Sequence, residues 1–126
     1  MKVDHLALYV LDIDSMRNFY VNYFNAKPSA LYCNPHTGFR SYFLSFEDGA
    51  RLELMTKPGL PNEEGREHTG YAHIAFYIGS RAGVNALTAR LKEDGFPVVS
   101  GPRTTGDGYY ESCVLDPEHN RVELVG

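Results

Sequence analysis

The chain has 126 residues, of which 43% are hydrophobic and 22% charged, and its formal net charge is −4 at neutral pH. This length suits one domain with a substantial hydrophobic core. The negative charge and the lack of a lysine or arginine cluster argue against a nucleic-acid-binding protein. No apolar run approaches the roughly 20 residues of a membrane helix, and the N-terminus has no signal-peptide pattern. We therefore expect a cytoplasmic protein that binds neither nucleic acid nor membrane.

The first half of the chain predicts one helix and four strands. Residues 2–10 alternate in polarity and are rich in β-forming types, which is typical of a strand. A helix follows, with Asp12 or Asp14 as its N-cap, and ends near Asn25. The turn signal Glu47-Asp48-Gly49 predicts a hairpin between the last two strands. The three later strands are expected around residues 31–33, 41–46 and 51–56.

The second half predicts the same order of elements. The stretch 57–70 is polar and contains proline and glycine, so we expect a linker there. A strand is predicted over 71–78, and a helix capped by Ser80 runs to about Asp94, with Gly95 just beyond its end. Three strands close this half, near residues 97–100, 109–115 and 121–125.

The two halves also repeat each other in sequence. His5 lies in VDHLALYV, and its twin His73, 68 residues later, lies in YAHIAFYI. Glu53 lies in RLELM, and its twin Glu123, 70 residues later, lies in RVELV. Such self-similarity determines the architecture of a chain. We therefore predict an α+β fold of one domain over 1–126, made of two tandem βαβββ modules (about 1–57 and 70–126) joined by a linker (about 58–69).

Strand geometry places the four repeated polar side chains on matching faces. Alternate side chains of a strand point to opposite faces, and the helices must cover the apolar faces. The other faces are expected to curve around a central cleft that holds His5, Glu53, His73 and Glu123. A buried carboxylate is costly without a partner, and imidazole nitrogens and carboxylates are normal ligands of first-row divalent ions. The four residues predict one metal site that suits Ni, Co, Mn, Fe(II) or Zn.

The glutamates have a second possible explanation. Glu53 and Glu123 could form salt bridges with Arg51, Arg121 or Lys57 instead of binding a metal. A repeated histidine alone, or a repeated glutamate alone, could arise by chance. Both repeat in register across the two halves, and this favours the metal site.

The remaining histidines and the cysteines predict no site. His36, His68 and His119 lie in predicted loops or turns, where exposed polar roles are expected. Cys33 and Cys113 are the only cysteines and lack the spacing of a metal-binding motif. We expect both to be buried or half-buried free thiols in a reducing compartment.

With these stretches identified, the chain resembles the vicinal oxygen chelate superfamily. This group includes glyoxalase I, extradiol dioxygenases, methylmalonyl-CoA epimerase, fosfomycin-resistance enzymes and bleomycin-binding proteins. The resemblance covers the whole chain and rests on HLALYV, RLELM, GYAHIAF, GDGYYES and LDPEHNRVEL. A His, Glu, His, Glu quartet is the pattern of short bacterial glyoxalase I, and it maps to His5, Glu53, His73 and Glu123.

The resemblance implies a metal-dependent lyase or isomerase of the glyoxalase I type, acting on a small substrate with two adjacent oxygens. One divalent ion per site would stabilise the enediolate that forms when a proton leaves the substrate. Glu123 is the implied base, and Glu53 is its symmetric partner. A homodimer with two sites is the usual assembly. Tyr9 and Tyr77 could line the cleft, and Arg103 and Tyr109 lie in a stretch that could close over a ligand, although all four could equally be ordinary wall or surface residues.

Two positions depart from the glyoxalase I pattern. That family tends to have an arginine four residues after the first histidine, which helps to hold glutathione, and this chain has Tyr9. It also tends to have an asparagine four residues after the first glutamate, and this chain has Lys57. The glutathione pocket is therefore not supported and a different substrate is expected, with methylglyoxal hemithioacetal kept as a candidate. The alternatives are a non-catalytic drug- or metabolite-binding module, and a metal-dependent dioxygenase or thiol transferase of the same superfamily.

Overall fold

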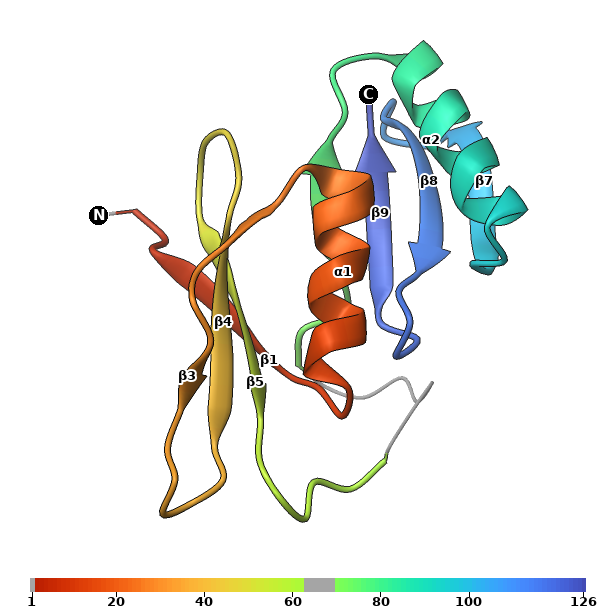
Figure 1. Cartoon of the computed structure of the whole chain (residues 1–126). Coiled ribbons are helices and arrows are strands. Elements are labelled where there is room, and N and C mark those ends of the chain that lie inside the picture. The colour runs from red at the N-terminus through yellow and green to blue at the C-terminus, as the bar shows by residue number, and fades with distance from the viewer. Residues whose placement is uncertain (1, 63–69) are drawn as a thin grey trace. The chain divides into compact units, whose positions relative to one another are not determined.

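The computed structural model describes residues 2–62 and 70–126. The chain divides into two compact units, Met1–Glu63 and Glu64–Gly126. In each unit the described residues form one mixed sheet and one helix (Figure 1). The predicted α+β class with two βαβββ-like modules is confirmed at this level.

The first unit forms a sheet in the order β1-β5-β4-β2, with β3 also paired to β4. Strands β1 and β5 are parallel, whereas β4 is antiparallel to β5, β2 and β3. The elements are β1 (His5–Tyr9), α1 (Ile13–Phe24), β2 (Lys27–Pro28), β3 (Tyr32–Cys33), β4 (Arg40–Ser45) and β5 (Arg51–Thr56).

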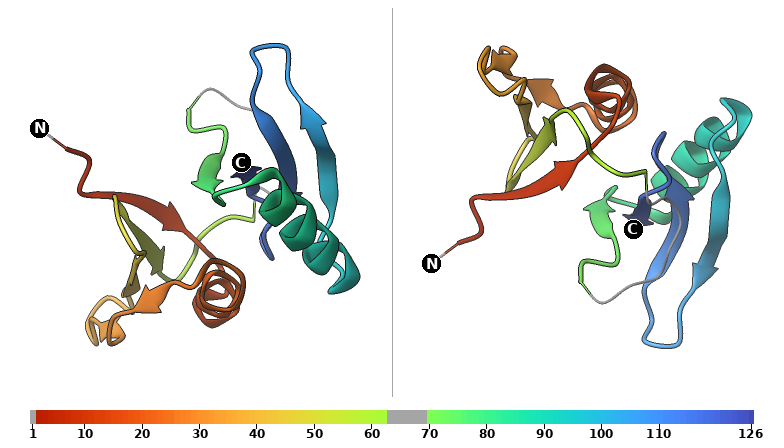
Figure 2. Two further views of the ribbon diagram at one scale, coloured as in Figure 1. Left: turned by 90° about the horizontal axis from the view of Figure 1, so that it is seen from above. Right: turned by 90° about the horizontal axis from the view of Figure 1, so that it is seen from below.

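The second unit forms a sheet in the order β6-β9-β8-β7. Strands β6 and β9 are parallel, and the other two pairings are antiparallel. The elements are β6 (Ile74–Tyr77), α2 (Arg81–Glu93), β7 (Val98–Thr104), β8 (Tyr110–Leu115) and β9 (Arg121–Val125). Helix α2 runs along one face of this sheet and contacts β7, β8 and β9 (Figure 2).

The predicted strands differ from the observed ones mainly at the edges of the sheets. The sequence does not predict the short edge strand β2, because Pro28 cannot donate a backbone hydrogen bond and proline usually argues against a strand. Strand β7 runs on past the predicted end at residue 100, because irregularities in its register with β8 accommodate Pro102. Residues 57–62 form no helix or strand, and the rest of the predicted linker up to 69, including His68, lies outside the described residues.

Both helices begin at a side-chain cap. Asp12 caps α1, since its Oδ1 accepts a hydrogen bond from the backbone N of Ser15 at 3.0 Å. This decides between the two predicted caps, Asp12 and Asp14. Ser80 caps α2 in the same way, with its Oγ 3.1 Å from the backbone N of Gly83. An N-cap of this kind stabilises a helix by about 1 kcal/mol.

The helices cover the apolar faces of their own sheets, as predicted. Helix α1 contacts β2, β4 and β5, and α2 contacts β7, β8 and β9. The fully buried side chains on the strands include Leu44, Leu52 and Leu54 in the first unit and Val114, Val122 and Leu124 in the second. The faces that remain carry His5, Glu53, His73 and Glu123. No helix in residues 2–62 and 70–126 is long and apolar enough to cross a membrane.

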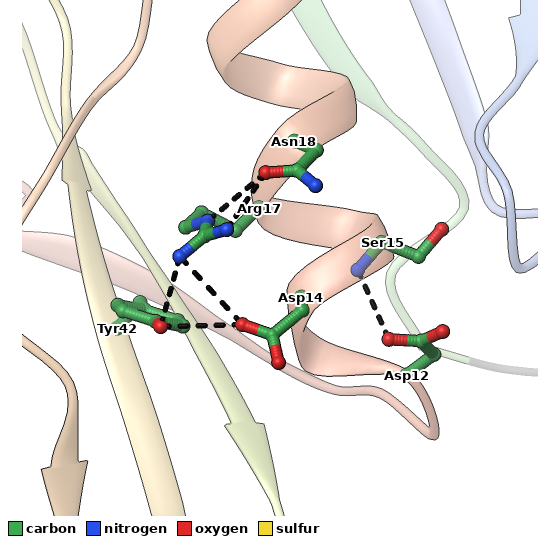
Figure 3. A network of polar contacts seen from close by, with 6 residues as sticks. All are labelled: Asp12, Asp14, Ser15, Arg17, Asn18 and Tyr42. Atoms are coloured by element: carbon green, nitrogen blue, oxygen red, sulfur yellow. Dashed lines mark hydrogen bonds and ion pairs between the residues drawn. The ribbon is translucent and has the colours of Figure 1, made fainter.

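Each helix is also tied to its sheet by polar contacts. In the first unit Arg17 Nη1 donates to Tyr42 Oη at 3.0 Å, and Tyr42 Oη donates to Asp14 Oδ1 at 3.2 Å (Figure 3). In the second unit the hydroxyls of Thr88 and Ser112 lie 2.6 Å apart and both residues are buried. These ties fix how each helix sits on its own sheet, and hence the face that stays open.

Candidate metal centre

The first His–Glu pair is set by the parallel register of β1 and β5. Ala7 lies opposite Glu53 in that register, so His5, two residues earlier, is a diagonal neighbour of Glu53 on the same face. His5 Nε2 lies 3.7 Å from Glu53 Oε2. The Glu53 side chain is 15% exposed and that of His5 is 39% exposed, so the carboxylate is largely buried beside the ring.

The second pair repeats this arrangement. Ala75 lies opposite Glu123 in the parallel register of β6 and β9, and His73 just precedes β6. His73 Nε2 lies 3.2 Å from Glu123 Oε2, with the two side chains 42% and 21% exposed. The same strand pairing therefore brings together a histidine and a glutamate in both units.

The donor atoms of each pair suit a divalent ion. Two ligands bound side by side to one ion at about 2.1 Å lie roughly 3.0–3.4 Å apart, close to the 3.2 Å of His73 and Glu123 and slightly less than the 3.7 Å of His5 and Glu53. Imidazole and carboxylate together favour first-row ions. Within the described parts of the chain no three His, Cys, Asp or Glu side chains form a metal-binding group. The structure thus brings the ligands together as pairs, and the four-residue centre stays a prediction.

His5 contacts Asp4 and Phe43, and Arg51 contacts both of these residues. Its Nδ1 lies 2.9 Å from Asp4 Oδ2, and the same oxygen accepts from Arg51 Nη2 at 2.6 Å. The Arg51 guanidinium stands over the ring of Phe43 at 4.5 Å, and Phe43 meets His5 edge to face at 5.4 Å. The hydrogen bonds from His5 and Arg51 lower the pKa of Asp4 below its usual value. In the described residues, then, the ion pair of Arg51 is with Asp4.

Asp4 was not predicted as a site residue. Its signal in the sequence is weak: an acidic residue directly before the predicted ligand His5. Alternation in the predicted strand over 2–10 places Asp4 on the face opposite His5, whereas β1 begins only at His5. The contact of Asp4 with His5 could therefore be found only from the structure.

The surroundings of His73 and Glu123 differ. Cys113 lies opposite Glu123 in the antiparallel register of β8 and β9, the position that Phe43 has opposite Glu53. Burial, and then the charge of Glu123, raise the pKa of the Cys113 thiol. Both cysteines are free thiols, as predicted, but Cys33 is exposed and not buried or half-buried as expected.

The four predicted substrate contacts are all exposed. Tyr9 is 52% exposed at the end of β1, and Lys57 Nζ stands 5.2 Å from the centre of its ring. Tyr77 and Tyr109 are 77% and 59% exposed. Arg103 Nη2 lies 3.8 Å from Glu111 Oε1 on the neighbouring strand. None of these contacts in the described residues reaches a predicted metal ligand, so their role stays a prediction.

Two of the three histidines predicted in loops, His36 and His119, lie in turns as expected, and His68 is outside the described residues. His36 is exposed in the turn after β3, where its backbone N donates to Asn34 Oδ1 at 3.0 Å. His119 is exposed in the turn between β8 and β9, with a φ of 62°. Neither lies in an arrangement of metal ligands within the described residues.

Comparison with known proteins gives the same family from the sequence and from the fold. The family model of the Glyoxalase/Bleomycin resistance protein/Dioxygenase superfamily matches residues 2–124. The uncharacterized protein YqjT of Bacillus subtilis (strain 168) is 28% identical over 96% of this chain and 95% of its own length.

Two solved structures illustrate the similarity in fold. The structure of a possible glyoxalase from Bacillus cereus is 26% identical, with a TM-score of 0.72 over 100% of this chain and 99% of the other. The trypanothione-dependent glyoxalase I of Leishmania major has a TM-score of 0.80 over 100% of this chain and 86% of the other, at 22% identity. Because the family model matches nearly the whole chain, the chain belongs to the Glyoxalase/Bleomycin resistance protein/Dioxygenase superfamily.

Proposed function

We propose that this protein is a metal-dependent lyase or isomerase of the glyoxalase I type, acting on a small substrate with two adjacent oxygens. The observation that carries the proposal is the duplicated pair of ligands. In both units a histidine Nε2 faces a largely buried glutamate Oε2, at 3.7 Å and 3.2 Å. A superfamily member that only binds a drug or metabolite has no need to keep both pairs.

The residues that would hold the ion are His5, Glu53, His73 and Glu123. A divalent ion bound there, whether Ni, Co, Zn, Mn or Fe(II), supplies the positive charge that stabilises an enediolate. A homodimer with two such sites forms part of the proposal.

The proton is moved by a glutamate side chain. Glu123 takes the proton from the substrate carbon next to a carbonyl, and the electrons of the broken C–H bond form the enediolate double bond. Returning the proton to the neighbouring carbon completes an isomerisation. Glu123 suits this role better than Glu53, because its neighbour on the adjacent strand is the small Cys113 and not the bulky Phe43. A smaller neighbour leaves the carboxylate more room to move.

The surface near the first pair supports a substrate other than a glutathione adduct. Tyr9 and Lys57 occupy the two positions that depart from the glyoxalase I pattern, and they contact each other, with Lys57 Nζ 5.2 Å from the ring centre. A cation and an aromatic ring in contact are a stable surface pair. Small dicarbonyl and 2-hydroxycarbonyl compounds are therefore the substrates to test first.

Elemental analysis tests the proposal. The protein is purified without a chelator or a histidine tag, and wild type is compared with His73→Ala and with His36→Ala, the latter removing an exposed histidine from a turn. We expect about one divalent ion per site in wild type and His36→Ala, and none in His73→Ala. If wild type takes up no ion even after incubation with Ni, Co, Mn, Fe(II) and Zn, the enzyme proposal is wrong and a binding module takes its place.

A further inference from the structure

Asp4 is bound to Arg51 through both its backbone and its side chain. The backbone N of Arg51 donates to the carbonyl of Asp4 at 2.9 Å, and Arg51 Nη2 donates to Asp4 Oδ2 at 2.6 Å. The Asp4 side chain is 64% exposed, so burial does not fix it. Its position depends on these two hydrogen bonds and on the one that it accepts from His5.

The contact with Asp4 determines which nitrogen of His5 carries hydrogen. An ionised carboxylate only accepts hydrogen bonds, so the 2.9 Å contact requires a hydrogen on His5 Nδ1. When the ring is neutral, its lone pair is therefore on Nε2, which lies 3.7 Å from Glu53 Oε2. Two acceptor atoms that face each other need a donor or a cation between them. This is the arrangement of a metal ligand whose other nitrogen is held by a carboxylate.

His73 lacks this support from its own sequence neighbour. The residue directly before it is Ala72, at the position that Asp4 has in the first unit, and alanine has no side chain that can accept a hydrogen bond. Cys113 takes the position of Phe43, so that position offers His73 no aromatic ring. The second unit thus repeats the histidine but has different residues at the positions of Asp4 and Phe43.

We propose that Asp4, held by Arg51, is the positioning residue of His5: it keeps the hydrogen on Nδ1 and the Nε2 lone pair directed at Glu53. The His5–Glu53 pair is then the half of the metal site that has a positioning carboxylate directly before its histidine, whereas Ala72, directly before His73, supplies none. The effect on metal binding rests on the proposed function. The position of the hydrogen on His5, by contrast, is a property of the metal-free protein.

The first experiment reads the hydrogen position on the imidazoles without any metal. Long-range 1H–15N NMR spectra of the metal-free protein near pH 8 distinguish the Nδ1–H, Nε2–H and doubly protonated forms, and His5→Gln assigns the His5 signals. We expect wild-type His5 to be in the Nδ1–H form. Asp4→Ala should move His5 toward the Nε2–H form and leave His73 unchanged, whereas Asp4→Asn should retain most of the Nδ1–H form, because its amide oxygen still accepts. A doubly protonated His5 in wild type, or no change in Asp4→Ala, overturns the proposal.

The second experiment measures the affinity for Ni or Zn by competition with a coloured chelator. Loss of the residue that orients a histidine ligand usually weakens metal binding about 10- to 100-fold, and we expect a loss in that range for Asp4→Ala and a smaller one for Asp4→Asn. Asp48→Ala removes the same charge from the exposed turn between β4 and β5 and should bind as wild type does. Equal affinities of wild type and Asp4→Ala would show that Asp4 does not position a ligand.

The two experiments separate this inference from the proposed function. If wild type binds no ion, the proposed function fails while the NMR spectra still decide the role of Asp4. If wild type binds an ion and Asp4→Ala changes neither the tautomer nor the affinity, the proposed function stands and the positioning role is wrong.

Discussion

The two units build the same His–Glu pair with different neighbours. In both, a parallel strand pair places an alanine opposite the glutamate and a histidine two residues before that alanine in sequence. Around the first histidine stand Asp4, Arg51 and Phe43, whereas Ala72 and Cys113 take the positions of Asp4 and Phe43 in the second unit. Strand register therefore fixes where the ligands lie, and the residues around them determine how firmly each one is held.

The same contrast holds on the opposite face of each sheet. Tyr42 and Ser112 occupy corresponding positions of β4 and β8, where Tyr42 lies opposite Leu54 and Ser112 opposite Leu124. Tyr42 joins Asp14 and Arg17 of its helix in a part-buried network (Figure 3). Ser112 instead contacts the hydroxyl of Thr88 in a small buried contact. The buried apolar side chains between helix and sheet are repeated in the two units, whereas the polar contacts between helix and sheet are not.

The largest expected difference between the two units lies in their glutamates. Glu123→Gln should keep the fold and lower the rate of substrate proton exchange about 10²- to 10⁴-fold, the usual contribution of a general base. Glu53→Gln should reduce metal occupancy, and at saturating metal it should retain more activity than Glu123→Gln. Exchange of substrate hydrogen with deuterated water, followed by NMR, measures this, with Glu47→Gln in an exposed turn as the control. Persistent exchange in Glu123→Gln would make the base assignment wrong.

Matched substitutions in the two hydrophobic cores test whether apolar packing contributes equally to the stability of both units. Leu54 and Leu124 occupy corresponding positions and are both fully buried. Leu54→Ala and Leu124→Ala should each lower the free energy of unfolding by about 2–5 kcal/mol, through lost apolar contact and the cavity left behind. Urea unfolding followed by circular dichroism measures it. Leu31→Ala, at a 43% exposed site, should cost much less, and a similar loss at all three positions would argue against the packing described here.

The two cysteines, one in each unit, are expected to differ in thiol reactivity. Cys113 is buried and its pKa is raised, chiefly by burial, whereas Cys33 is exposed. Because only the thiolate reacts, iodoacetamide at pH 8 should alkylate Cys33 at least about tenfold faster than Cys113. The Cys113 rate should continue to rise above pH 9, since a raised pKa delays formation of its thiolate. Peptide mass spectrometry measures both rates, and urea should make them equal. Equal rates in the folded protein would mean that Cys113 is accessible.

The apolar and repeated features of this chain were predictable from its sequence, and the local polar contacts were not. Both helices, the hairpin strand β5 and the closing strand β9 agree with the prediction, because their apolar periodicity and cap residues leave few alternatives. The two His–Glu contacts follow from the repeat and from strand alternation. The link from Asp4 to Arg51 joins residues 47 positions apart, and the edge strand β2 depends on pairing with β4. Neither feature has a local pattern that could predict it.

The smallest expected effects concern the contacts that fasten the helices. Tyr42→Phe removes the hydroxyl that accepts from Arg17 and donates to Asp14, and Ser112→Ala removes the partner of the Thr88 hydroxyl. Each should lower the free energy of unfolding by about 1 kcal/mol, the usual net contribution of a hydrogen bond. Ser112→Ala should cost no more than this, because Thr88 Oγ1 still donates to the carbonyl of Val84 at 2.6 Å. Urea unfolding measures both, with Tyr71→Phe at an 86% exposed site as the matched control. If Tyr42→Phe is as neutral as that control, the network of the first unit does not stabilise the position of its helix, and the apolar contacts alone hold the two layers together.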